Sequence, residues 1–177
     1  MTTTALDARW AAAQAGLSRG WIETRQSLTE TANVVGQVIP PVANLAVLLF
    51  IRAVTRGKTV PGTDFPIVAM ILPSLLGMTI AYGGFCAPAV SITADREDGT
   101  LLRAKATPNG MLGYIVGKVV MFGSTTLLGV LAIVLPGIMI VDALVLDVRA
   151  WLLLALLFVV GMVATVPIGV ALGSLMK

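Results

Sequence analysis

The sequence predicts an all-α membrane protein, a polytopic bundle of about four transmembrane helices preceded by an amphipathic helix at the membrane interface. Hydrophobic residues make up 57% of the 177 residues, only 12% are charged, and the mean hydropathy is +0.95. Soluble domains contain about a quarter charged residues, so this chain has too few to cover a water-facing surface. Four apolar segments are each long enough to cross a bilayer.

The N-terminal segment, residues 1-33, contains both acidic and basic residues and precedes the first apolar run. Trp10, Leu17, Trp21 and Leu28 recur at a spacing that places them on one side of a helix. Two tryptophans on such a stripe are typical of a helix that lies in the interface plane of a membrane. The alternative is a polar tail with accidental periodicity. The segment lacks the apolar core of a secretory signal, so we expect the first span to direct insertion.

The transmembrane domain is predicted over residues 34-177. A bilayer core of about 30 Å needs about 20 residues of helix. The apolar runs of this length predict spans at about 34-51, 66-92, 111-141 and 150-175. Eight lysines and arginines, counting Lys118, then fall on the side of the N-terminus and four fall on the opposite side. The positive-inside rule therefore favours both termini in the cytosol.

Few polar side chains interrupt these spans. Asn33, Gln37 and Asn44 share one face of the first span because they are separated by four and seven residues. This face either lines a substrate path or forms hydrogen bonds between helices that hold the bundle together. A charge near the bilayer centre is costly, so Lys118 is predicted to extend to the cytosolic interface, or otherwise to face a wet cavity.

The glycines that precede Lys118 superficially resemble a phosphate-binding loop. Gly113 and Gly117 are one residue too close, however, and valine follows the lysine. The chain therefore lacks a nucleotide-binding motif and is not expected to hydrolyse ATP. The same pair, like Gly169 and Gly173, is instead a small-xxx-small surface that permits close helix packing.

Other site classes find little support in the composition. The absence of histidine from the sequence excludes a histidine-dependent catalytic triad and a zinc site with imidazole ligands. We expect no cofactor and no metal. The net charge of +3 is spread over the loops, which gives no support to nucleic-acid binding.

The densest charge cluster of the chain lies in residues 95-108, between the second and third spans. Asp98-Gly99 predicts the end of the second helix. The next residues, 100-106, predict a short helix across the cytosolic ends of the spans. Thr107 and Pro108 then predict the N-cap and first residue of the third helix.

This loop resembles the cytosolic loop of permease subunits of type 2 ABC exporters. The resemblance rests on an acidic-arginine-acidic cluster, Asp95-Arg96-Glu97, followed by Gly99-Thr100-Leu101 and closed by Thr107-Pro108. It extends over nearly the whole chain and is closest to bacterial drug-export permeases. It implies a coupling helix that binds a separate ABC-type ATPase subunit, with the N-terminal amphipathic helix beside it.

The resemblance further implies that two permease copies, identical or different, enclose a path for drug-like or lipid-like amphiphiles across the bacterial plasma (inner) membrane. The ATPase-coupling residues would be Asp95, Arg96, Glu97, Gly99, Thr100, Leu101, Leu102, Arg103 and Lys105. Charged side chains would form ion pairs with the ATPase, and the two leucines would form an apolar anchor. Family members usually have six spans, so we expect this chain to be a fragment or a shortened homologue.

Two other functions compete with the exporter. The chain could be a non-transport four-helix membrane scaffold or assembly protein. It could also be a membrane-embedded enzyme, although the clustered carboxylates Asp95, Glu97 and Asp98 lack the second acidic motif that a metal-dependent phosphotransferase needs.

Overall fold

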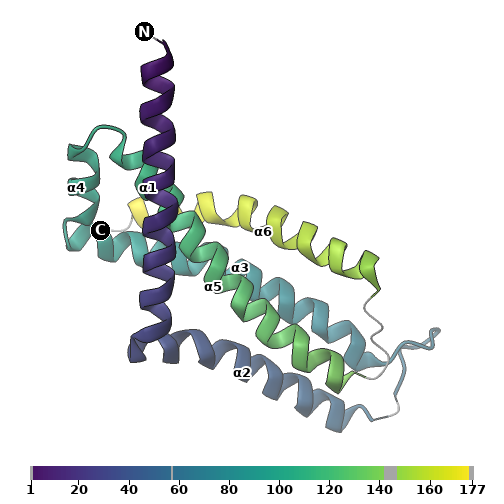
Figure 1. The fold of residues 1–177 in the computed structure, drawn as a ribbon. Coiled ribbons are helices and arrows are strands. Elements are labelled where there is room, and N and C mark those ends of the chain that lie inside the picture. The colour runs from purple at the N-terminus through teal and green to yellow at the C-terminus, as the bar shows by residue number, and fades with distance from the viewer. Residues whose placement is uncertain (1, 57, 142–146, 176–177) are drawn as a thin grey trace.

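The computed structural model describes residues 2–56, 58–141 and 147–175, and its regular elements there are helices (Figure 1). The predicted all-α class is therefore confirmed. The elements are α1 (Thr2–Thr29), α2 (Thr31–Val54), α3 (Ile67–Glu97), α4 (Thr100–Ala106), α5 (Gly110–Ile140) and α6 (Val148–Leu175).

Four helices, α2, α3, α5 and α6, are long and apolar enough to cross a membrane, which characterises the chain as a multi-pass membrane protein. Their bounds agree with the predicted spans to within a few residues, except that α3 continues to Glu97. α3 packs along α6, and α5 packs against α1, α2 and α3. Buried apolar side chains such as Leu48, Leu72 and Ile133 form the common core.

The four spans run beside one another, whereas α1 lies across one end of them (Figure 1). The short helix α4 lies at that same end, and the connection between α2 and α3 lies at the opposite end. Both helices that the resemblance assigns to the ATPase side therefore lie at the same end of the spans.

The ends of α4 show which boundary predictions hold. Gly99 has a φ of 72°, a left-handed conformation that suits glycine, and it separates α3 from α4 as predicted. The prediction that Thr107 is the N-cap of the third span is wrong. The backbone N–H of Gly110 donates to Thr107 O at 3.0 Å, so a turn follows α4. The N-cap of α5 is instead Asn109, which has a φ of 58°.

The N-terminal segment is helical from Thr2 to Thr29, as the prediction of an amphipathic helix requires. The side chains of the predicted apolar stripe are exposed, with Trp10 at 68% and Trp21 at 66%. A neighbouring face of α1, which contains Gly16 and Gly20, packs against α5. The stripe is thus free to contact lipid.

Candidate functional site

The crossing of α1 over α5 is unusually close because glycines meet on both helices. A Cβ atom added at Gly16 would lie 2.5 Å from Gly113 O, and one at Gly20 would lie 2.5 Å from Gly117 O. The second predicted glycine pair, on α6, similarly meets backbone atoms of α3. Both small-xxx-small predictions are therefore confirmed as helix-packing surfaces.

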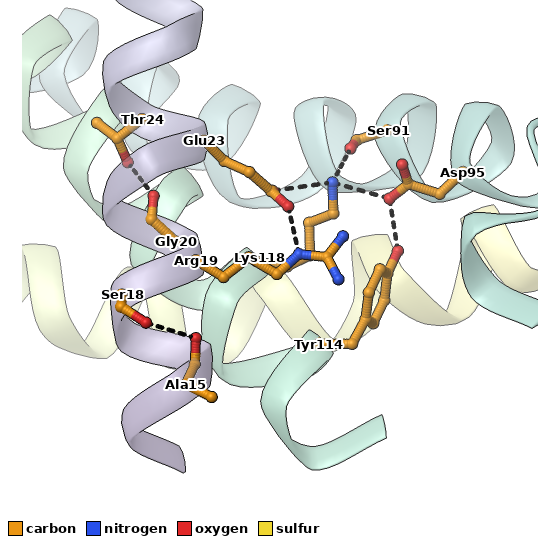
Figure 2. A network of polar contacts seen from close by, with 10 residues as sticks. All are labelled: Ala15, Ser18, Arg19, Gly20, Glu23, Thr24, Ser91, Asp95, Tyr114 and Lys118. Atoms are coloured by element: carbon orange, nitrogen blue, oxygen red, sulfur yellow. Dashed lines mark hydrogen bonds and ion pairs between the residues drawn. The ribbon is translucent and has the colours of Figure 1, made fainter. Parts of the chain in front are cut away.

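This close crossing brings an acidic residue of α1 to a lysine of α5. Lys118 Nζ lies 2.8 Å from Asp95 Oδ2 on α3 and 3.4 Å from Glu23 Oε2 on α1 (Figure 2). It also donates a hydrogen bond to Ser91 Oγ at 3.1 Å. Lys118 is only 7% exposed, and its ammonium points to carboxylates of α1 and α3 rather than into open solvent. The lysine is buried because two carboxylates from other helices compensate its charge.

Two further side chains complete the network that Figure 2 shows. The Tyr114 hydroxyl donates to Asp95 Oδ2 at 2.6 Å, and Arg19 Nε donates to Glu23 Oε1 at 2.7 Å. The Arg19 and Lys118 side chains approach the Tyr114 ring centroid to 5.6 and 5.7 Å, respectively. We call Arg19, Glu23, Asp95, Tyr114 and Lys118 the charged network. It joins α1, α3 and α5 and pairs two cations with two anions.

The charged network fixes the positions of helices rather than presenting a reactive group to solvent. The Lys118 side chain is 9% exposed, and the side chains of Glu23 and Asp95 are 19% and 18% exposed. Paired charges with so little exposure tolerate separation poorly, because each partner would be left uncompensated. Among the described residues, no group of three or more His, Cys, Asp or Glu side chains could hold a metal ion.

The structure divides the predicted coupling loop into inward-facing and outward-facing residues. Asp95 belongs to the charged network, and Arg96 Nη1 donates to Ser174 O at the end of α6 at 2.8 Å. The side chains of Glu97, Arg103 and Lys105 are exposed, whereas Gly99 and Thr100 are half-buried.

The two leucines of α4 face different surroundings. Leu101 packs with Ile92, Ala104 and Tyr114 below α4. Leu102 is 68% exposed. Of the predicted pair, only Leu102 therefore offers an exposed apolar surface, whereas Leu101 anchors α4 to the spans.

The predicted polar face of the first span serves two different purposes. Asn33 and Gln37 line a cavity of about 540 Å³ between α2, α3 and α5. Asn44 instead donates a hydrogen bond to Thr79 Oγ1 on α3 at 3.2 Å. The interhelical hydrogen bond predicted as one alternative is thus confirmed for Asn44, whereas the substrate path stays a prediction for Asn33 and Gln37.

Sequence reasoning missed three members of the charged network, Arg19, Glu23 and Tyr114. A usable signal was present, because a lysine within a span requires a counter-charge and acidic residues precede it on α1 and α3.

Comparison of the chain with protein-family models, with curated proteins and with solved structures finds no match to any of them.

Proposed function

We propose that this chain is the membrane-spanning permease subunit of an ATP-driven type 2 ABC exporter of drug-like or lipid-like amphiphiles. In this proposal a separate ABC-type ATPase hydrolyses ATP and binds α4, and a second permease copy, identical or different, completes the path. The chain resides in the bacterial plasma membrane with both termini in the cytosol. The loop sequence Asp95-Arg96-Glu97 with Gly99-Thr100-Leu101 supports the proposal, as does the position of α1 and α4 at the same end of the spans.

One observation carries the proposal: α4 is exposed on its outer side and packs against α3 and α5 on its inner side. Leu102 and Arg103 face outward, where a partner could bind them. Asp95, just before α4, is held by Lys118, which also contacts Glu23. A displacement of α4 would therefore be transmitted to α3 and α5, and through Glu23 to α1. A rigid-body movement of packed helices is a common form of such a transition.

The exposed leucine provides the first test. Leu102→Asp is expected to reduce capture of an ABC-type ATPase by about tenfold, because an apolar anchor at an interface is worth more than about 1 kcal/mol. The tagged chain is purified in mild detergent from its native membranes, and ABC-type ATPase subunits are quantified by mass spectrometry. Phe65→Asp is the matched control, because Phe65 is 65% exposed and lies in the α2–α3 connection at the opposite end.

A charge reversal gives a second pair for the same measurement. Glu97→Arg should also reduce capture, whereas Asp64→Arg, an exposed acidic residue in the α2–α3 connection, should not. If the wild-type chain captures no ABC-type ATPase, the exporter proposal is wrong and the membrane scaffold becomes the better interpretation. Equal losses in the α4 variants and their controls would exclude α4 as the binding surface.

A further inference from the structure

The cavity of about 540 Å³ lies within one chain, between α2, α3 and α5, and Ser27 at the end of α1 closes part of it. Its volume is in the range of sites that bind drug-sized molecules. Two of its lining residues, Tyr82 and Val90 on α3, are 56% and 71% exposed. The cavity is therefore open on its side, where the spans would face lipid.

The lining changes from polar to apolar with distance from the α1 end of the bundle. Asn33 and Gln37 lie in the first turns of α2, and Ser91 lies about 9 Å from the end of α3, at a helical rise of about 1.5 Å per residue. Pro41, about 15 Å along α2, and Phe122 on α5 form apolar walls farther in.

Hydroxyl groups in the deeper part are already engaged by their own helices. Thr79 Oγ1 donates to Leu75 O at 2.8 Å, and Thr125 Oγ1 donates to Met121 O at 2.9 Å. By contrast, the amide of Gln37 forms only a long hydrogen bond, 3.4 Å, from Nε2 to Ser27 O. Asn33 Nδ2 donates to Glu30 Oε2 at 2.8 Å. The Gln37 amide and the Asn33 carbonyl oxygen are therefore the groups placed to bond a ligand at the polar end.

The lining residues that the structure describes are all uncharged. The nearest cation is Lys118, whose ammonium contacts Ser91 Oγ, and its charge is compensated by Asp95 and Glu23. The Glu30 carboxylate, which accepts the hydrogen bond from Asn33, lies beside the polar end of the cavity. An anionic ligand would therefore enter a low-dielectric region next to a like charge, which is costly.

We propose that this cavity binds an amphiphile without a negative charge that enters from the lipid. Its hydroxyl or carbonyl head would lie at Asn33 and Gln37, and its apolar part would lie between α2, α3 and α5. This inference deepens the proposed function by naming the class of substrate. Its interpretation as a transport site rests on the proposed function. The binding itself needs no ATPase.

The test uses monodecanoylglycerol that contains a photoreactive diazirine in its acyl chain. The purified chain in lipid nanodiscs is irradiated with this probe, without ATPase or ATP, and the adducts are mapped by mass spectrometry. We expect saturable labelling within residues 33–41, 79–91 and 121–129, displaced by unmodified monodecanoylglycerol. Decanoate should require at least about a tenfold higher concentration, because its charge is not compensated in the cavity and would lie near the Glu30 carboxylate.

Two glycines provide a matched pair of variants. A Cβ atom at Gly36, which lines the cavity, or at Gly77, which does not, would meet no atom within 4 Å. Gly36→Phe should therefore fill the cavity without disturbing the fold and lower saturable labelling by about tenfold. Gly77→Phe should label like the wild type, and Gln37→Leu should weaken binding of the glycerol head.

Labelling that does not saturate, that spreads evenly over all four spans, or that persists unchanged in Gly36→Phe would overturn the inference. Equal competition by decanoate would overturn the restriction to ligands without a negative charge. The result is separate from the ATPase capture experiment. Saturable labelling with no captured ATPase would support ligand binding in the cavity and reject the exporter. Capture of the ATPase without saturable labelling would support the exporter and reject this cavity as its substrate site.

Discussion

Lys118→Met is expected to destabilise the bundle by about 3 kcal/mol, the lower end of the cost of removing one partner from a buried ion pair. The substitution leaves Asp95 and Glu23 without their shared counter-charge. We place the effect at the lower end because both carboxylates are about a fifth exposed, so water compensates part of the loss. Thermal unfolding of the purified chain in detergent, followed by circular dichroism, measures the change. Lys105→Met, on the exposed side of α4, is the control and should leave the unfolding temperature nearly unchanged.

A combined variant separates the charge effect from the loss of packing. Lys118→Met together with Asp95→Asn and Glu23→Gln leaves no unpaired carboxylate at Lys118, so it should recover much of the stability lost in Lys118→Met. Purely additive losses would show that the three side chains do not act as a unit. Identical unfolding of Lys118→Met and Lys105→Met would contradict a stabilising role for the charged network.

Gly20→Val is expected to separate α1 from α5 and thereby to break the Glu23–Lys118 contact. A Cβ atom at Gly20 would lie 2.5 Å from Gly117 O and 2.8 Å from Val120 Cβ. The backbone oxygen belongs to a continuous helix and cannot move aside, so the helices must part. Trypsin cleavage after Arg19 and Arg25 should accelerate by about tenfold, because local opening would cost about 1.4 kcal/mol less.

Gly123→Val is the control for this cleavage experiment. A Cβ atom at Gly123 on α5 would meet no atom within 4 Å, so the variant introduces the same valine without a clash. Its cleavage rate should match that of the wild type. Cleavage of Gly20→Val at the wild-type rate would mean that the close α1–α5 crossing does not hold α1 in place.

The spans and α4 could be predicted from the sequence because their signals are local. Hydropathy over about 20 residues determines a span, and Gly99 alone supplies the left-handed residue that separates α3 from α4. The start of α5 was mispredicted because Thr107-Pro108 matches a common helix start, whereas Asn109 adopts the left-handed conformation that places the helix later.

The charged network could be predicted only in part, because it depends on how separate helices pack. Lys118 was recognised as costly, but its partners Asp95 and Glu23 come from two other helices, and no periodicity links the three positions. The same limit applies to α4. Helical spacing alone does not show that Leu101 packs inward while Leu102 stays exposed, since this depends on where α4 lies against Ile92 and Tyr114.

The order of the three ionic side chains along the chain has a consequence for membrane insertion. Glu23 and Asp95 both precede Lys118 in the sequence, so the two acidic residues are synthesised before the lysine. When α5 leaves the translocon, its lysine meets carboxylates that are already at the membrane. The insertion cost of a lone lysine at the centre of a span, about 3 kcal/mol on translocon scales, can then be offset as it arises. A shuffled order, with α5 synthesised before α3, would leave that lysine without Asp95 during biogenesis.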